Sequence, residues 1–419
     1  MRVLAAMSGG VDSAVAAALV AEQGHEVVGV HMALLRNRQL FREGSRGCCS
    51  IEDAQDARRV ADQIGIPFYV WDLSENFQET VVSDFLEEYA AGRTPNPCVR
   101  CNEHVKFETL LARASALGFD AVATGHYAQV LYDDAGRPSL HRSPNAAKDQ
   151  SYVLAVMGPD RLAHAMFPLG GFASKDQVRA EAEKRGFGLS SKPDSYDICF
   201  IPDGDTRGFL ADRLGDRPGP IVDSTGEQVG QHQGAYAFTV GQRKGLHLGR
   251  PAANGQPRYV TQVNTRTNTV VVGPLELLSV NHIECTDVVM YDSAQAGEPL
   301  EVQVRAHGQP VACTVTVLAA GTAGAAGAAG QDATSAAQLD AGADSGLGPE
   351  PGGAASDSGP EPGGAAKMVI SLTDQMLRGV AAGQSAVIYR ADRVIAQGTI
   401  ASARRISEKG EQVRPVDQR

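Results

Sequence analysis

The segment VLAAMSGGVDSAVAAALVAEQG, residues 3–24, combines a strand, a turn and a helix in one short run. Its apolar start predicts a strand over Val3–Met7, and the alanine-rich part predicts a helix over Asp12–Gln23 that Gly24 ends. Two glycines let the backbone of the turn approach an anion, while the amides and the positive dipole end of the helix face the same point. The segment therefore predicts a phosphate-binding loop directly after the first strand.

The predicted phosphate loop is SGGVDS, residues 8–13. It lacks the lysine that follows the glycines of a Walker loop. Asp12 is predicted to orient a Mg²⁺ ion or its water, and the hydroxyls of Ser8 and Ser13 to donate hydrogen bonds to phosphate. The plainer alternative is a glycine turn with an aspartate at the helix start.

Strand and helix signals alternate beyond this segment, which predicts a doubly wound parallel sheet with helices on both faces. Near residue 208 the pattern changes to short strands and glycine-rich turns. We predict a first α/β unit over 1–207, a small and mostly β unit over 208–279, and a further β unit over 280–419. The expected elements of the first unit are strands over Glu26–Met32, Phe68–Leu73 and Ala121–Thr124, and helices over Ile51–Ile64, Asn76–Ala91 and Glu103–Leu117.

Composition is that of a soluble protein, with 43% hydrophobic and 21% charged residues among 419. No apolar run approaches the ~20 residues that cross a bilayer, and Asp12 interrupts the apolar start that a secretion signal would need. The seven cysteines are an odd number spread over a long chain, which is typical of a reducing compartment. We expect a cytoplasmic protein that does not enter the membrane.

The net charge of −11 would ordinarily disfavour a nucleic-acid partner. Six of the acidic residues, however, lie in residues 319–366, a segment without Lys or Arg that repeats GPEPGGAA. A composition of Ala, Gly, Ser, Pro and acids cannot build a core, so we predict a disordered insertion in a loop of the last β unit. The rest of the chain can still present a basic face to RNA.

Two cysteine sites are candidates for sulfur chemistry. Cys101 follows a proline-rich loop at the start of a predicted helix, next to Arg100, where a thiol pKa is expected to be depressed. Cys199 lies in a distant apolar segment, where a small core residue is the alternative. The Cys98-x-x-Cys101 spacing leaves open a zinc site or, together with Cys199, three ligands of an iron–sulfur cluster.

Six strings in one order give the chain a resemblance to a known family: SGGVDS, GRTPNPCVRCN, ATGHY, KDQSY, DSYDICF and TVGQRKGL. Together they resemble the bacterial tRNA-specific 2-thiouridylases, which belong to the PP-loop ATP pyrophosphatases. The resemblance runs from end to end apart from the insertion. It implies a PP-loop (Rossmann-like) catalytic domain, a small central domain and a C-terminal β-barrel.

The resemblance also implies a reaction, a tRNA-uridine 2-sulfurtransferase activity. ATP adenylates the C2 carbonyl oxygen of the wobble uridine, and sulfur displaces AMP. Cys199 would carry the sulfur as a persulfide, and Cys101 would be the nucleophile that helps to release it, leaving a Cys101–Cys199 disulfide. The implied cofactors are ATP and Mg²⁺, with a [4Fe-4S] cluster as an open alternative, and the implied partners of a monomeric enzyme are tRNA and a sulfur-relay protein.

Residue by residue, the resemblance assigns contacts with ATP and tRNA. Arg243 and Lys244 offer charges for an RNA backbone, with a polar hairpin tip as the alternative. Many relatives carry Asp at the position of Cys98, next to the target base, so this chain departs from the family pattern there. The implied ATP contacts are Ala6, Met7, Ser8, Gly9, Gly10, Val11, Asp12, Ser13, Met32 and Gly125, and the implied tRNA contacts are His126, Lys148, Asp149, Gln150 and Gln384.

Two rival functions remain at this point. Another PP-loop synthetase would adenylate a carboxylate or carbonyl and deliver nitrogen, for which no pair of distant cysteines is needed. A non-catalytic RNA-binding relative would keep the fold and release no pyrophosphate.

Overall fold

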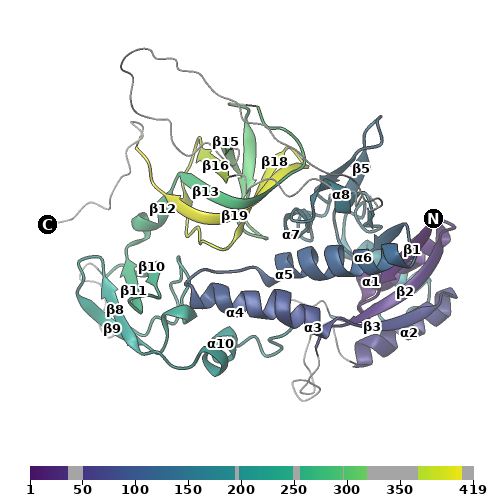
Figure 1. Ribbon diagram of the computed structural model, residues 1–419, viewed down its shortest axis with the longest axis horizontal. Coiled ribbons are helices and arrows are strands. Elements are labelled where there is room, and N and C mark those ends of the chain that lie inside the picture. The colour runs from purple at the N-terminus through teal and green to yellow at the C-terminus, as the bar shows by residue number, and fades with distance from the viewer. Residues whose placement is uncertain (36–50, 194–197, 249–254, 296, 319–366, 408–419) are drawn as a thin grey trace, which may run out of the picture.

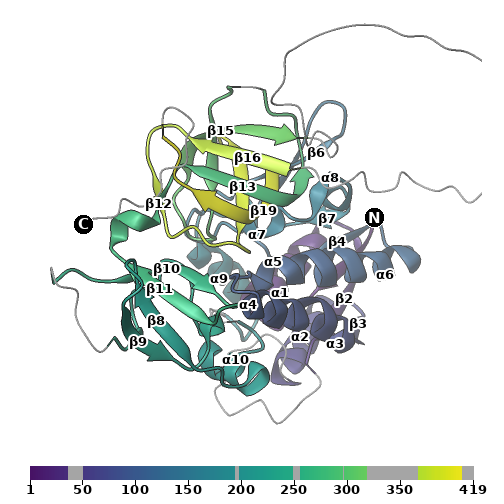
Figure 2. The same ribbon diagram turned by 60° about the vertical axis from the view of Figure 1, so that its left-hand side comes forward.

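The computed structural model describes residues 1–35, 51–193, 198–248, 255–295, 297–318 and 367–407 (Figure 1). An α/β unit at the N-terminus is followed by a small sheet and then by a barrel, and both views place the barrel above the small sheet (Figures 1 and 2). The predicted insertion at 319–366 lies outside the described residues. No helix in the described ranges is long and apolar enough to span a membrane.

The N-terminal sheet has the order β3-β2-β1-β4-β7, and every neighbouring pair is parallel. The predicted doubly wound parallel sheet is thus confirmed. The strand β7 was not predicted, because two residues leave no pattern in a sequence. The strands are β1 (Arg2–Ala6), β2 (Glu26–Ala33), β3 (Phe68–Asp72), β4 (Ala121–Ala123) and β7 (Ala165–Met166).

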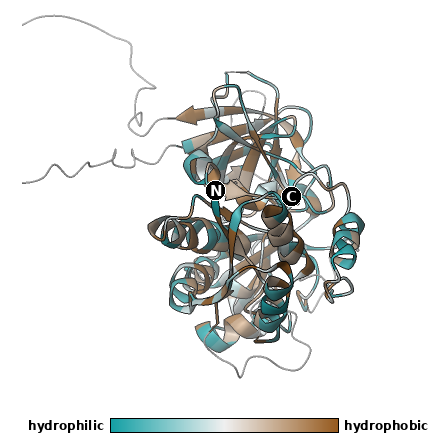
Figure 3. Cartoon of the chain, turned by 90° about the vertical axis from the view of Figure 1, so that its right-hand side faces the viewer, coloured by the Kyte–Doolittle hydropathy of each residue, from teal (hydrophilic) through white to brown (hydrophobic). Residues whose placement is uncertain are grey.

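Helices cover both faces of this sheet. After Arg2, successive side chains of β1 point to opposite faces and are apolar, so both faces must be covered. Val3 and Ala5 pack in the same core as α1 (Val11–Glu22), α2 (Ile51–Ile64) and α9 (Lys175–Lys184). Leu4 and Ala6 face the opposite core, which includes α6 (Leu110–Ala116). Figure 3 shows helices with one apolar side and one hydrophilic side. Helix α1 is alanine-rich and 8 of its 12 residues are buried, as expected for a helix that is apolar on most of its surface.

Two composite helices run beside the sheet. The first joins α3 (Ser74–Phe77), the π-helical η2 (Gln78–Val82) and α4 (Ser83–Ala90). The second joins α5 (Pro97–Arg100), the π-helical η3 (Cys101–Thr109) and α6. It begins before the predicted Glu103, because the Asn96 side chain accepts hydrogen bonds from the amides of Cys98 and Val99 and Pro97 starts the helix.

The small central unit begins with α10 (Thr206–Leu214) and contains a sheet in the order β10-β11-β8-β9. Its core is built from β-branched residues such as Ile221, Val260 and Val270. The two-stranded pair β12 (Ser279–Val280) and β17 (Leu377–Arg378) follows beside it. The sheet strands are β8 (Gly219–Asp223), β9 (Gln228–His232), β10 (Tyr259–Asn264) and β11 (Thr269–Gly273), and the short 3-10 turns are η4 (Ala235–Ala237) and η5 (Leu275–Leu278).

The C-terminal strands form the expected barrel, in the order β13-β16-β15-β14-β18-β19, which pairing of β19 with β13 closes. Leu318 of β15 pairs with Lys367 of β16, so the chain leaves and re-enters the barrel at neighbouring positions on either side of the predicted insertion. The strands are β13 (His282–Met290), β14 (Leu300–Gln303), β15 (Val311–Leu318), β16 (Lys367–Leu372), β18 (Ser385–Arg390) and β19 (Arg393–Arg404).

The barrel also packs on the N-terminal unit. A hairpin of β5 (Gln129–Tyr132) and β6 (Pro138–His141) adds to the barrel sheet where His141 pairs with Arg393 of β19. Side chains of β18 share one core with α7 (Ser151–Leu154) and α8 (Gly158–Leu162). The unit boundaries at 207 and 279 stay predictions.

Candidate active site

A cavity of about 390 Å³ opens at the carboxyl ends of β1 and β4. The strand order reverses between these two strands, and this is where doubly wound sheets bind ligands. Most of the predicted site residues line its wall. They are Ala6, Ser8, Gly10, Val11, Asp12, Ser13, Met32, Cys98, Cys101, Gly125, His126, Lys148, Gln150 and Cys199.

The phosphate loop has the geometry that its glycines predict. Gly9 has φ +81°, and a Cβ at this position would lie 2.2 Å from the backbone oxygen of Asp53. Gly10 is the N-cap of α1, so within the described residues no side chain caps the first amides of this helix. These amides can bind an anion. Met7, although assigned to ATP by resemblance, has its side chain in the core.

The serines of the loop hold the loop together. The Ser8 amide donates to Ser13 Oγ at 3.1 Å, and the Ser13 hydroxyl lies 3.1 Å from the Gly10 carbonyl, to which it donates. The Ser8 and Ser13 hydroxyls lie 3.2 Å apart. The Ser13 hydroxyl therefore does not donate a hydrogen bond to phosphate in this geometry, and the backbone amides are the better donors.

Two lysines that the sequence analysis missed reach the phosphate loop. Lys175 Nζ donates to both carboxylate oxygens of Asp12, at 2.7 and 2.6 Å, and the Tyr127 hydroxyl donates to Asp12 Oδ1 at 2.6 Å. The Asp12 carboxylate is therefore neutralised by an ammonium group, and its role toward Mg²⁺ stays a prediction.

The second lysine, Lys192, ties the loop to α2. Its Nζ donates to the Gly9 carbonyl at 2.9 Å and to carboxylate oxygens of Asp53 at 2.7 Å and Asp56 at 2.6 Å. Burial lowers the pKa of Lys192, but the hydrogen bonds that it donates to the two carboxylates outweigh burial and the net pKa is raised. No local sequence motif indicates a role for either lysine. Each lies more than 160 positions after the loop residue that it contacts, Lys175 in α9 and Lys192 after the end of α9.

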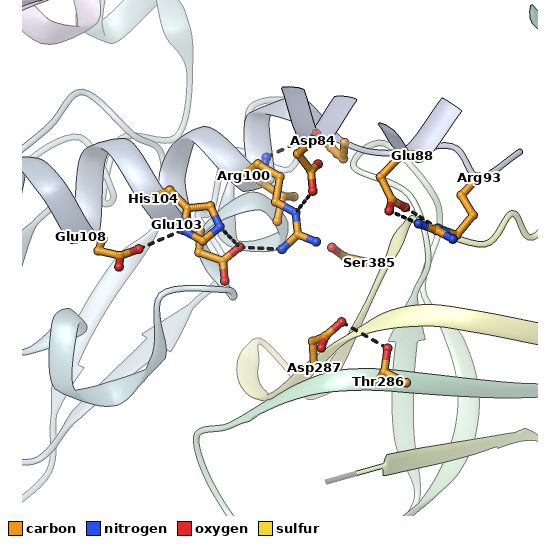
Figure 4. Close-up of polar contacts among 12 residues, drawn as sticks. Asp84, Glu88, Arg93, Arg100, Glu103, His104, Glu108, Thr286, Asp287 and Ser385 are labelled. Atoms are coloured by element: carbon orange, nitrogen blue, oxygen red, sulfur yellow. Dashed lines mark hydrogen bonds and ion pairs between the residues drawn. The ribbon is translucent and has the colours of Figure 1, made fainter. Parts of the chain in front are cut away.

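The cysteine-bearing helix differs from its prediction in one respect. Because the helix starts at Pro97, Cys101 lies one turn inside it and not at its N-terminus. Figure 4 shows the Arg100 side chain turned to two acids, with Nη1 2.9 Å from Glu103 and Nε 3.4 Å from Asp84. Arg100 is thus paired with carboxylates, and its effect on the Cys101 thiol stays a prediction.

Cys101 and Cys199 are both half-buried and face the same cavity although they lie far apart in sequence. Cys98 is more exposed and lines the cavity as well. In the described part of the chain, no three His, Cys, Asp or Glu side chains lie together so that they could hold a metal ion. The iron–sulfur and zinc alternatives therefore have no ligand set among the described residues. Residues 194–197, the start of the DSYDICF string, lie outside the described residues.

The predicted RNA contacts divide into two groups. Lys148 and Gln150 line the cavity, and Gln150 Oε1 accepts a hydrogen bond from the Tyr127 amide at 2.9 Å. Asp149 is turned inward, where its carboxylate accepts hydrogen bonds from the Ser143 and Ser151 amides at 2.9 and 3.2 Å. It shapes the turn before α7 and does not line the cavity.

Gln384 also lies outside the cavity wall. It precedes β18 in the barrel, and its Nε2 donates to the Thr94 carbonyl at 2.6 Å. This bond joins the barrel to the proline-rich loop that leads to the cysteines. Arg243 and Lys244 are exposed on the small central unit.

His126 is 8% exposed, and both of its ring nitrogens have partners. Nδ1 lies 2.7 Å from Thr124 Oγ1, and Nε2 lies 3.3 Å from Lys106 Nζ. Burial and, second, the charge of Lys106 hold the pKa of His126 well below its usual value. Lys106 lines the cavity and was not among the predicted site residues.

Two family models match the chain. The tRNA methyl transferase HUP domain matches residues 1–203, and the tRNA methyl transferase PRC-barrel domain matches residues 207–274. The tRNA-specific 2-thiouridylase of Beutenbergia cavernae is 57% identical over 97% of this chain and 96% of its own length. That of Paenarthrobacter aurescens is 51% identical over 98% of this chain and 100% of its own length.

The model descriptions and the relatives' names differ in the reaction that they mention. The relatives carry more weight, because they match this chain from end to end. Among solved structures, a 4-thiouridine synthetase–RNA complex with bound ATP covers 50% of this chain and 50% of its own, with 16% identity and a TM-score of 0.31. That likeness is too low to support a conclusion about function.

Proposed function

Because the chain belongs to the tRNA-specific 2-thiouridylase family, we propose that it uses ATP to replace the C2 carbonyl oxygen of the wobble uridine of tRNA with sulfur. The observation that carries this proposal is one cavity that joins a phosphate loop to two distant cysteines, Cys101 and Cys199. A phosphate loop alone would suit any adenylating enzyme. The two thiols on the same wall favour sulfur over nitrogen as the incoming atom.

The first step is adenylation. The β- and γ-phosphates of ATP bind the amides at the start of α1, with Met32 beside the adenine and Gly125 beside the loop. The C2 carbonyl oxygen forms a bond to the α-phosphorus, the bond from that phosphorus to pyrophosphate breaks, and pyrophosphate leaves with the electron pair. Mg²⁺ would accompany ATP as the counter-ion of its phosphates, and Asp12, paired with Lys175, is the carboxylate of the loop that would face it.

The second step is sulfur transfer. The terminal sulfur of a Cys199 persulfide attacks C2, and AMP leaves with the former carbonyl oxygen. The Cys101 thiolate then attacks the Cys199 Sγ, so the sulfur–sulfur bond of the persulfide breaks and 2-thiouridine is released. The Cys101–Cys199 disulfide formed in this step returns to two thiols when a dithiol reductant takes up the oxidising equivalents. We also propose a monomeric, cytoplasmic enzyme that receives its persulfide sulfur from a carrier protein.

The test combines nucleoside analysis with two cysteine variants. Anaerobically purified protein is incubated with ATP, Mg²⁺, a low-molecular-weight persulfide and unmodified tRNA, and the digested nucleosides are analysed by mass. We expect 2-thiouridine with the wild-type protein, and its loss in Cys101→Ser and Cys199→Ser while tRNA-dependent pyrophosphate release continues. If both variants retained full product formation, a thiol mechanism would be excluded.

Cys285 supplies a matched control. It is buried in the barrel core, away from the cavity, and burial raises the pKa of its thiol to about 12. A Cys285→Ala variant should form 2-thiouridine at the wild-type rate. A wild-type protein that binds tRNA but releases no pyrophosphate would instead be a non-catalytic RNA-binding relative.

A further inference from the structure

The lysines of the cavity wall differ in their partners. Lys175 is paired with Asp12, and Lys192 with Asp53 and Asp56. The Lys106 ammonium faces a histidine, with Nζ 3.3 Å from His126 Nε2. Within the described ranges, no carboxylate lies at ion-pair distance from it. A cation that lines a cavity without a counter-charge is a candidate for binding a negatively charged group of a substrate.

The hydrogen bonds of His126 define its state. An ammonium group can only donate, so Nε2 accepts from Lys106 and the ring proton is on Nδ1, from which it is donated to Thr124 Oγ1 at 2.7 Å. The low pKa of His126 keeps the ring neutral. Phe107 and Phe167 pack against the ring, with centroids 6.1 and 5.9 Å away. These contacts fix the ring, and the ring in turn fixes the ammonium group.

The ammonium group lies between the two halves of the site. Gly125, directly before His126, touches the phosphate loop so closely that a Cβ there would lie 2.7 Å from the Ser13 amide nitrogen. On the other side, Cys101 precedes Lys106 by five residues in the π-helix η3, the spacing of one π-helical turn, and both line the cavity. The α-phosphoryl group of ATP and the reacting carbonyl must meet between these two halves.

We propose that Lys106 is a catalytic cation of adenylyl transfer, and that His126 and Thr124 are positioning residues that hold it. The inference rests on the proposed function and deepens it. As the carbonyl oxygen bonds to the α-phosphorus and pyrophosphate departs, negative charge grows on the non-bridging oxygens of that phosphorus. The Lys106 ammonium stabilises this charge and keeps its proton throughout. His126, implied by resemblance to contact tRNA, acts mainly through Lys106.

The test measures tRNA-dependent pyrophosphate release, which isolates the first step. Removing one preorganised donor from a developing anion lowers kcat by about 10²–10³-fold in other enzymes, and we expect a loss in that range for Lys106→Met. The KM for ATP should change by no more than a few-fold, because the interaction forms in the transition state. Lys106→Arg should recover part of the rate, since it keeps the charge.

Lys184→Met is the matched control. This lysine is 74% exposed on α9 and does not line the cavity, so its loss should leave pyrophosphate release unchanged. Lys106→Gln, which keeps a donor, serves as the second variant if Lys106→Met melts at a lower temperature than wild type. If correctly folded Lys106→Met released pyrophosphate at the wild-type rate, the inference would be overturned, and the same holds if it lost only 2-thiouridine formation.

A double-variant cycle tests the positioning role. If His126 acts through Lys106, His126→Ala should lower kcat for pyrophosphate release in the wild-type background and add almost nothing to Lys106→Met. Fully additive losses would show that His126 acts independently and would contradict its assignment. A wild-type protein that releases no pyrophosphate would refute the proposed function itself, which is a different result from any of these.

Discussion

Alanine substitutions at Gly9 and Gly24 can be compared to test how tightly the phosphate loop is packed. Both have a positive φ, +81° and +83°, and they flank the same helix α1. An alanine at either position incurs the left-handed conformation, which costs roughly 1–2 kcal/mol. At Gly24 nothing lies within 4 Å of the added Cβ, whereas at Gly9 it would lie 2.2 Å from the Asp53 backbone oxygen. Overpacking of this kind adds about 1–3 kcal/mol.

We therefore expect Gly9→Ala to lower the free energy of unfolding by about 2–5 kcal/mol in total, and Gly24→Ala by only about 1–2 kcal/mol. The loop must also shift to relieve the contact, so Gly9→Ala should lose most tRNA-dependent pyrophosphate release while Gly24→Ala keeps it. Chemical denaturation and pyrophosphate release, measured on both variants, give the comparison. Equal destabilisation by the two substitutions, with activity intact in Gly9→Ala, would refute the packing argument.

Three further predictions concern one lysine at the phosphate loop and two residues of the barrel. Lys192→Met removes the ammonium shared by two aspartates. It should lower the free energy of unfolding by about 2 kcal/mol and raise the KM for ATP. An unchanged KM would show that this lysine does not help to hold the phosphate loop in its binding conformation. Gln384→Ala loses the 2.6 Å bond to the Thr94 carbonyl and should cost about 1 kcal/mol and raise the KM for tRNA more than that for ATP, as steady-state kinetics can show. The hydrogen bond from Arg390 is the chief cause that lowers the pKa of the Glu298 carboxyl from 4.5 to about 2. Its contribution to stability is thus present above pH 4.5 and lost as the pH falls toward 2. Glu298→Gln should therefore destabilise the protein more at pH 7 than at pH 3 in denaturation experiments, and an equal effect at both would argue against the pair.

Much of the N-terminal fold could be predicted because its signals are local. The strand of residues 3–7, the glycine turn and the alanine-rich helix follow from composition over a few residues each, and the structure has them within one or two positions. The predicted start of the Cys101 helix was several residues too late. A Pro-rich loop usually disfavours a helix, but here Asn96 caps the helix and the proline stands at its first position, where it is tolerated. The strand β7 was missed because its two residues carry no period.

The site was predictable only in part, for a physical reason. The glycines and cysteines of the site lie in short, recognisable motifs, so the loop and both thiols could be predicted from the sequence. Lys175, Lys192 and Lys106 look like ordinary surface lysines in the sequence, and only the fold brings their ammonium groups to the cavity. The pairing of Arg100 with Asp84 and Glu103 likewise depends on which way a helix face turns.

The central claim is that a uridine oxygen leaves as part of AMP, and an isotope tests it most directly. A tRNA carrying ¹⁸O at C2 of the wobble uridine is incubated with the protein, ATP, Mg²⁺ and a low-molecular-weight persulfide, and the AMP formed is analysed by mass. The account predicts one ¹⁸O atom in the phosphate of AMP for each 2-thiouridine made. Formation of 2-thiouridine with unlabelled AMP would contradict it.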